Sequence, residues 1–352
     1  MPHPTVEGLN LQLGGTGPRC VLVTIMKNEA PYIVEWACYH YALGFREILV
    51  FSNFSDDYTD QILDRLDDLG IVRHRPHPIN AFSSVGQVQI SALRFAQVFP
   101  QFKASEYMMM IDADEFLEVQ IGSQDLAALF DHFGEFEVAS FRMRGRRFPD
   151  DTLIGDGQML SRFSTATYSN PADLSKHPTG ANSVKSLAKS KLKKGFHRNH
   201  RPMVRGFSSL GLRWLDGSGQ NLPPDFTDRR VSSVHLDDRE QVAIVNHYAV
   251  RSAEGFLAKM LRGDAAVSVR NNLDEAAVRS WIEYWTARKR GGERVEVPAK
   301  LPPGFTQLFG TIMSDQVIRK LQDAAIEVHR SKAKLVLESP FGRRIATAFG
   351  LD

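Results

Sequence analysis

Apolar runs and helical spacing alternate along the first third of the chain. Residues 20–26, CVLVTIM, form a continuous apolar run rich in β-branched side chains, which predicts a strand buried on both faces. Apolar residues then recur at helical spacing from Ile33 to Tyr41, and Gly44 is a suitable helix end. The same order continues with a strand, a helix and a strand at 46–52, 61–70 and 71–75. This order predicts an α/β fold with a doubly wound, mostly parallel sheet and helices on both faces.

The sequence pattern predicts further helices and strands after residue 75. Their expected positions are a helix at 85–98, a strand at 106–111, a helix at 123–132, and strands at 137–144 and 242–250. Residues 149–224 are rich in Gly, Ser, Asn and Pro, so we expect long site-forming loops there. Helical spacing returns at 252–262, at 274–288 and from 314 onward. We therefore expect a flexible tail at 1–17, an α/β domain at 18–250 and a helical C-terminal extension at 251–352.

Composition narrows the class of protein. The 352 residues carry a formal net charge of +2 and are 43% hydrophobic, which argues against disorder and against a strongly basic nucleic-acid-binding protein. Cys20 and Cys38 are too few for a disulfide scaffold, so a reducing interior is expected. No apolar run is long enough to span a membrane, and residues 1–19 lack the features of a secretory signal. The expected location is cytoplasmic, and association with the inner face of a membrane stays open.

The strand expected at 106–111 ends in an Asp-x-Asp sequence. Asp112 and Asp114 are two residues apart in extended chain, so both carboxylates project to the same side. Two oxygen donors so placed suit a divalent ion such as Mg²⁺ or Mn²⁺, and ligands of open α/β sheets bind at this end of the strands. The alternative is a pair of solvated acids in a turn.

Polar residues also follow the first two predicted strands and should lie on the same edge of the sheet. They are Lys27, Asn28, Glu29, Asn53, Ser55, Asp56 and Asp57. The alternative for Asn53, Ser55 and Asp57 is helix capping, for which Thr59 is also suited. Two nucleotide-binding motifs are absent. The GGTG sequence precedes the first strand, so it cannot join a strand to a helix as a dinucleotide motif does, and no phosphate loop occurs.

Several segments together resemble the GT-A-fold glycosyltransferases, most nearly the family 2 branch related to family 92. They are VTIMKNEAPYIVEW, ILVFSNFSDDYTDQILDRL, YMMMIDADEF, NSVKSLAK, GFHRNHRP, WLDGSGQNLP and NHYAVRSAEGFLAKMLRG, within about residues 20–265. The resemblance implies transfer of a sugar from a nucleoside diphosphate sugar, here expected to be UDP-linked, to a glycan or glycolipid in surface polysaccharide synthesis. Ser52 departs from the acidic residue usual in family 2, which leaves the nucleotide open.

The resemblance also assigns roles to residues. It implies donor binding by both strand ends and a metal ion at the Asp-x-Asp sequence, and it strengthens His247 as a third ligand. The donor-binding set is Lys27, Asn28, Glu29, Asn53, Ser55, Asp57, Asp112, Lys185 and His197, and the metal set is Asp112, Asp114 and His247. A core role for His247 is the alternative. Lys259, Arg262 and Gly263 match the same family and either bind phosphate or pack their helix.

Residues 174–215 contain ten Lys and Arg but no Asp or Glu. This stretch suits a basic lid over a pyrophosphate or a site for an acidic acceptor, and a solvated loop is the alternative. Nucleic acid is not expected as a partner, and the oligomeric state stays open. No residue is named as the catalytic base. The candidates are Glu115, Asp150, Asp151, Asp156, Asp237, Asp238 and Glu254. The rival functions are a sugar-nucleotide pyrophosphorylase and a non-catalytic protein that binds glycan or nucleic acid.

Overall fold

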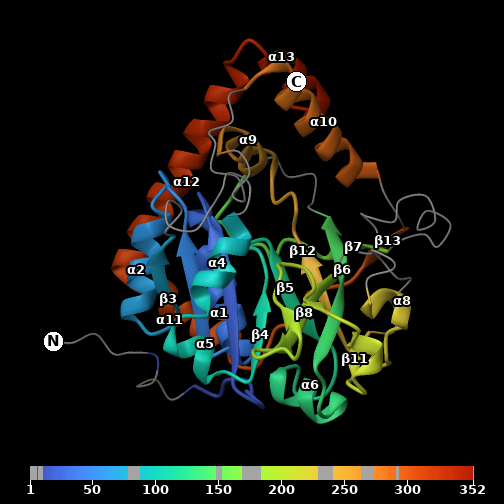
Figure 1. Cartoon of the computed structure of the whole chain (residues 1–352). Helices are drawn as coiled ribbons and strands as arrows, with labels where there is room; N and C mark the ends of the chain where they lie inside the picture. The colour runs from blue at the N-terminus through green and yellow to red at the C-terminus, as the bar shows by residue number, and fades with distance from the viewer. Residues whose placement is uncertain are drawn as a thin grey trace.

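A mixed β-sheet forms the centre of the molecule (Figure 1). The computed structural model describes residues 6, 11–77, 88–147, 153–168, 184–228, 241–262, 273–290 and 293–351. Within them the sheet has eleven strands, eight of which follow the order β13-β7-β6-β8-β4-β1-β2-β3. The strands of this sheet are β1 (Cys20–Met26), β2 (Glu47–Ser52), β3 (Arg73–Pro76), β4 (Tyr107–Met110), β5 (Glu115–Val119), β6 (Val138–Arg147), β7 (Thr165–Tyr168), β8 (Val184–Lys189), β11 (Trp214–Asp216), β12 (Ala243–His247) and β13 (Glu293–Glu296).

Helices cover both faces of the sheet, and a short hairpin lies outside it. The hairpin pairs β9 (Gly195–Phe196) with β10 (Met203–Val204). The helical segments are η2 (Ala30–Tyr32), α1 (Ile33–Leu43), α2 (Thr59–Asp68), α4 (Val88–Ala96), α5 (Pro100–Ala104), α6 (Leu126–Phe133), η3 (Phe207–Ser209), α8 (Pro224–Thr227), α9 (Ala253–Arg262), α10 (Glu275–Arg290), α11 (Phe305–Met313), α12 (Gln316–Leu337) and α13 (Gly342–Phe349). The predicted α/β class with a doubly wound sheet is confirmed.

Strands β3, β2, β1 and β4 are parallel, so their carboxyl ends share one edge of the sheet. Strand β8 then lies antiparallel between β4 and β6, inside a stretch expected to be irregular. That expectation was wrong at this strand and also at β7 and β11, which belong to the same sheet. The sequence of β8, VKSLAK, contains two lysines among small and apolar residues, a composition typical of exposed loops. Lys185 is nevertheless fully buried. Strand β5, antiparallel to β12, was also not predicted.

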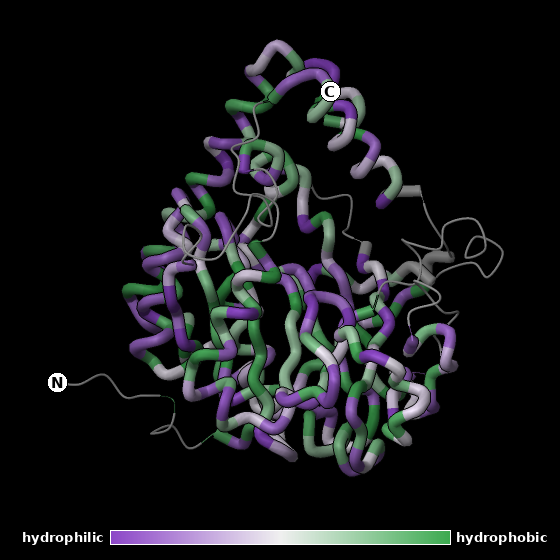
Figure 2. The backbone as a smooth tube through the Cα atoms, viewed as in Figure 1, coloured by the Kyte–Doolittle hydropathy of each residue, from purple (hydrophilic) through white to green (hydrophobic). Residues whose placement is uncertain are grey.

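The side chains of β1 alternate between two hydrophobic layers. Val21, Val23 and Ile25 pack with α4 and α5, whereas Leu22 and Met26 face the layer that contains α1 and α2. Because both faces are covered, the strand is apolar along nearly its whole length, as the sequence pattern indicated. Figure 2 shows the same arrangement as hydrophobic chain in the middle of the molecule, with hydrophilic stretches toward its periphery.

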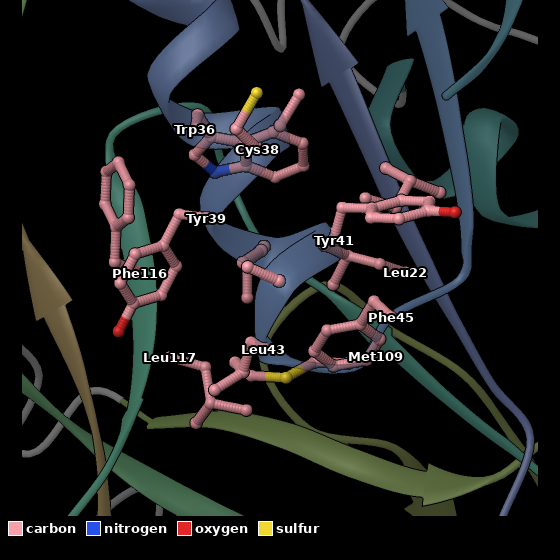
Figure 3. Packing of buried hydrophobic residues seen from close by; sticks show 14 of the residues in the cluster. Leu22, Trp36, Cys38, Tyr39, Tyr41, Leu43, Phe45, Met109, Phe116 and Leu117 are labelled. Atoms are coloured by element: carbon pink, nitrogen blue, oxygen red, sulfur yellow. The ribbon is translucent and has the colours of Figure 1, made fainter. Parts of the chain in front are cut away.

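Helix α1 is buried along its whole length and carries aromatic side chains toward β5. The Tyr39 ring lies edge-on to that of Phe116, with ring centroids 5.1 Å apart (Figure 3). Cys38 lies on the same helix, and both cysteines are buried and free, as expected. The chain before β1 reaches this layer as well, since Gly14 donates its N–H to the Ala42 carbonyl at 3.0 Å.

The C-terminal helix α12 packs against α2, η2 and α9 and rises along one side of the molecule (Figure 1). Its polar side chains reach the loops that follow β1 and β2. His329 bonds the Asp57 carboxylate at 2.6 Å, and Gln322 donates to the Pro31 carbonyl at 2.6 Å. The C-terminal helices therefore support one edge of the sheet. No described helix is long and apolar enough to cross a membrane.

Glu35 gives the stability a pH dependence that can be measured. Burial raises its pKa from 4.5 to about 7, although its carboxylate accepts the Met159 and Leu160 N–H groups. Between these values the folded state binds more protons than the unfolded state, so stability falls as pH rises. We expect the wild type to lose about 3 kcal/mol more than Glu35→Gln between pH 4 and pH 8 in urea unfolding.

The matched control is Glu338→Gln, which changes an exposed carboxylate on the far end of α12. Its free energy of unfolding should change with pH as steeply as that of the wild type. Equal slopes for wild type and Glu35→Gln would contradict the raised pKa.

Candidate functional site

The turn between β4 and β5 holds three carboxylates at the edge where the parallel strands end. Trp36 fixes this turn, because its indole N–H lies 3.1 Å from the Asp112 carbonyl and 3.0 Å from the Glu115 carbonyl. The Glu115 carboxylate also accepts the Asp112 backbone N–H at 2.8 Å. The Asp-x-Asp segment is therefore a rigid turn held by α1, and it is not a solvated loop.

Lys185 lies between two of these carboxylates. Its ammonium is 3.1 Å from Asp112 Oδ2 and 2.9 Å from Glu115 Oε2, and its side chain is fully buried. Both acids raise the pKa of Lys185, even though burial opposes its charged form. Burial raises the pKa of Glu115 to about 7. Lys185 lowers this pKa, but the nearby charges of Asp112 and Asp114 raise it and offset part of that effect. The lysine thus remains charged and neutralises much of the acidic turn.

Asp114 faces a different set of groups. His247, at the end of β12, has its Nε2 3.8 Å from Asp114 Oδ2, and Lys259 on α9 has its Nζ 3.4 Å from the same atom. Although burial opposes ionisation, Lys259 and His247 hold the pKa of Asp114 well below its usual range. Asp114 is therefore a carboxylate anion, the form that a divalent cation requires.

A buried cluster of cations surrounds Glu29, just beyond Asp114. Arg251 donates to the Glu29 carboxylate at 2.6 Å, and Arg262 bonds both that carboxylate and the Lys27 carbonyl. Burial alone would raise the pKa of Glu29, but the two arginines outweigh it and lower the pKa. Arg251 Nη1 is buried and has no hydrogen-bond partner among the described residues. Such a donor is suited to an anion.

The loops after β1 and β2 bind each other. Asn28 donates its amide to Asp56 at 2.6 Å, and its backbone N–H lies 3.2 Å from Ser55 Oγ. Asn53 is buried at the end of β2, where its N–H bonds the Met26 carbonyl. The capping alternative is not met at Asp57, because the N-cap of α2 is Tyr58. The Asp57 carboxylate instead accepts the Thr59 N–H and hydroxyl and the Ala30 N–H, and it bonds His329. These bonds give the edge a fixed shape.

Not every predicted residue reaches this edge. His197 bonds the Ser190 carbonyl at 3.0 Å and packs on Phe102, so it lies at the opposite end of β8 from Lys185. The structure does not bring His197 together with the carboxylates. Other candidate residues lie outside the described part of the chain. They are Asp150, Asp151, Lys176, Asp237, Asp238 and Gly263.

The predicted metal ligands meet only in part. No group of three His, Cys, Asp or Glu side chains is arranged to hold a metal ion within the described residues. Asp114 and His247 fit a shared ion, because two ligands that each lie about 2.1 Å from it can be up to ~4.2 Å apart. The third candidate, Asp112, is bound to Lys185 and to Gln89.

A family model described as "Glycosyltransferase family 92" matches residues 20–201, just over half of the chain. The chain belongs to glycosyltransferase family 92. The expected glycosyltransferase class is confirmed. The matched range includes the Asp-x-Asp turn, Lys185 and the loops after β1 and β2, whereas the cations of α9 lie beyond it.

Solved structures resemble this family 92 chain weakly. TarS of S. aureus, residues 1–349 in complex with UDP-GlcNAc, is 12% identical with a TM-score of 0.33, over 90% of each chain. The chain covers 55% of a longer TarS structure. Glucosyl-3-phosphoglycerate synthase of Mycobacterium tuberculosis, in complex with Mn²⁺, UDP and glucosyl-3-phosphoglycerate, is 15% identical with a TM-score of 0.28 over 49% of this chain and 57% of that one. Scores this low support no statement about ligands. No curated protein sequence matches the chain.

Sequence analysis missed residues that complete this edge. Arg251 was not named, although it lies four residues after His247, and its charge in a mostly apolar strand end was the available signal. Gln89, which donates to Asp112 at 3.2 Å, had no signal, because its position depends on how α4 packs. Lys185 was predicted to bind the donor, but its two ion pairs could not be inferred without β8.

Lys185→Met should destabilise the family 92 fold. The substitution removes the cation from the buried Glu115 and the half-buried Asp112, so we expect the free energy of unfolding to fall by about 3–5 kcal/mol in urea denaturation. Adding Glu115→Gln should recover part of that loss, since one buried charge is then removed. If the two substitutions instead add independently, Lys185 does not neutralise Glu115.

Proposed function

We propose that this family 92 chain is a metal-dependent transferase that moves a sugar from a UDP-linked donor to a glycan or glycolipid acceptor. The observation that supports it most is the cluster of two buried arginines, Arg251 and Arg262, and the half-buried Lys259 beside the anionic Asp114. These three cations face two carboxylates, and this excess of positive charge suits a diphosphate. A role in surface polysaccharide synthesis fits the expected acceptor class.

The proposed catalytic domain spans residues 18–250, and the helical extension spans 251–352. The extension supplies part of the donor site, because Arg251 lies at their junction and α9 carries Lys259 and Arg262. We assign the extension a double role. It binds phosphate through α9 and supports the strand-end loops through α12.

The nucleotide is assigned to the edge formed by the loops after β1 and β2. Lys27, Asn28 and Glu29 provide backbone and side-chain groups there, and Asn53 and Ser55 close the second loop. Asp57 acts from beneath by fixing the Ala30 and Thr59 backbone. Asp112, which is partly exposed, would contact the donor beside the turn, and the buried Lys185 would hold its carboxylate in place. His197 is not placed in this arrangement, since it lies at the other end of β8.

Asp114 and His247 are the residues that would hold a Mn²⁺ or Mg²⁺ ion. When bound, the ion stabilises negative charge on the departing diphosphate as a Lewis acid. Arg251 and Lys259 contribute to the same end, because they lie in a buried setting where a fixed positive charge interacts strongly with phosphate. His247 binds an ion only as the neutral imidazole, and the nitrogen that faces Asp114, Nε2, must then carry no proton.

Metal-linked nucleotide binding tests the proposal. By isothermal titration, we expect UDP to bind the wild-type protein more tightly with Mn²⁺ than without it. The factor by which Mn²⁺ increases UDP affinity should be at least ten times smaller in Asp114→Asn. Electron paramagnetic resonance of Mn²⁺ reports ion binding in the same samples. The control is Asp323→Asn, an exposed position on α12, which should match wild type.

Two results would contradict the proposal. One is UDP binding that does not respond to Mn²⁺, and the other is unchanged binding in Asp114→Asn. Slow release of sugar from the UDP-linked donor in Mn²⁺ separates an enzyme from a pure binding protein, which should release none.

Lys259 should act in opposite directions on the ion and on the nucleotide. Its ammonium lies beside Asp114, so Lys259→Met removes repulsion toward Mn²⁺ and an attraction toward phosphate. We expect several-fold tighter Mn²⁺ binding in the absence of nucleotide and several-fold weaker UDP binding, both by titration. If Lys259→Met instead weakened the binding of both Mn²⁺ and UDP, Lys259 would only pack α9.

A further inference from the structure

We propose that a groove beside the β9–β10 hairpin binds an acceptor saccharide that carries negative charge, as uronate or phosphate. This inference rests on the proposed function and names the acceptor class. The groove has a volume of about 860 Å³. Its lining is Leu192, Lys194, Gly195, Phe196, Met203, Val204, Arg205, Gly206 and Asp228. Such a volume accommodates several sugar units or an equally large anionic group.

Two cations, Lys194 and Arg205, and one carboxylate, Asp228, line this groove, and Lys191 and Lys193 lie next to it in the sequence. Lys191, Lys193, Lys194 and Arg205 are all exposed, and within the described residues none of these four forms an ion pair with a carboxylate. Asp228, on the lining, instead accepts the Ser208 backbone N–H and hydroxyl. The groove therefore offers cations to an outside partner, and the absence of acidic residues between 174 and 215 extends this bias along the chain.

An aromatic ring lies at the same place. Phe196 is 57% exposed although it belongs to a paired strand, and it lines the groove next to Lys194. A sugar ring can pack its apolar face on such an aromatic ring while its charged substituents bind the neighbouring cations. This combination of an aromatic face and cations around a concave surface suits an anionic saccharide.

Two hydrogen bonds connect Asn199, which lies close in sequence to the groove residue Phe196, to the Asp-x-Asp turn. Asn199 donates to Gln89 at 2.6 Å, and Gln89 donates to Asp112 at 3.2 Å. Asn199 is three residues after Phe196, a span of at most about 11 Å of chain. An oligosaccharide with its end at the donor site could therefore extend along residues 196–199 into the groove.

Two other partners fit less well. A pyrophosphate already has the cluster of Arg251, Arg262 and Lys259, which adjoins Asp114. A membrane surface favours several apolar side chains on a convex face, whereas this site is hollow and exposes one large aromatic ring. The observations thus favour a soluble or extended saccharide chain.

The test is titration of the full chain with saccharides in the absence of donor. The anionic probes are hexagalacturonate and phosphorylated maltohexaose, and the neutral probe is maltohexaose. We expect wild type to prefer at least one anionic probe over the neutral one, and Lys194→Glu/Arg205→Glu to weaken that binding at least tenfold. Phe196→Ala should weaken it several-fold. The control is Arg319→Glu/Lys320→Glu, which makes the same change of charge at exposed positions of α12 and should keep wild-type affinity.

Four results would overturn the inference. They are no preference for either anionic probe, equal losses in the groove and control variants, loss of UDP binding in the groove variant, and groove-dependent binding to phosphatidylglycerol vesicles without saccharide binding. Thermal unfolding verifies that each variant is folded, and Phe196→Ala keeps the test open if the charge reversal unfolds the protein. UDP titration with Mn²⁺ is a separate measurement, so failure of the donor site and failure of the groove are distinguishable.

Discussion

The ion pairs of Lys185 are the interaction on which the acidic edge depends. Three carboxylates lie within four residues of this turn, and two of them, Asp114 and Glu115, are buried, so the turn needs a cation to offset their lost hydration and mutual repulsion. Lys185 supplies that cation from β8, which lies between β4 and β6. The antiparallel insertion of β8 in the sheet therefore has an electrostatic reason as well as a packing one.

The three carboxylates of the turn therefore differ in the cations that they face. Asp112 and Glu115 are neutralised by Lys185, whereas Asp114 faces His247 and the cations of α9. Asp114, whose pKa is lowered, is thus the side chain that faces the positive cluster. Chemistry that needs an anion-binding pocket beside a strong carboxylate can occur here, while the rest of the turn acts as a support.

The parallel strands and their helices could be predicted from the sequence, because apolar runs such as 20–26 and spacing such as Ile33 to Tyr41 depend on local burial. The Asp-x-Asp turn followed from the same strands. Strand β8 could not be predicted, because its lysines are stabilised by partners about 70 residues away in sequence. The cluster around Glu29 joins residues more than 200 positions apart, and no local pattern encodes such contacts.

The bond between His329 and Asp57 has a consequence for how the protein is made. Asp57 orders the backbone after β2, but its partner on α12 is synthesised 272 residues later. All eleven described strands of the sheet precede α12 in the sequence, so the sheet can be complete before His329 has been synthesised. A nascent chain with a complete sheet would still lack this partner of Asp57, so the loop after β2 would become ordered only once α12 has left the ribosome.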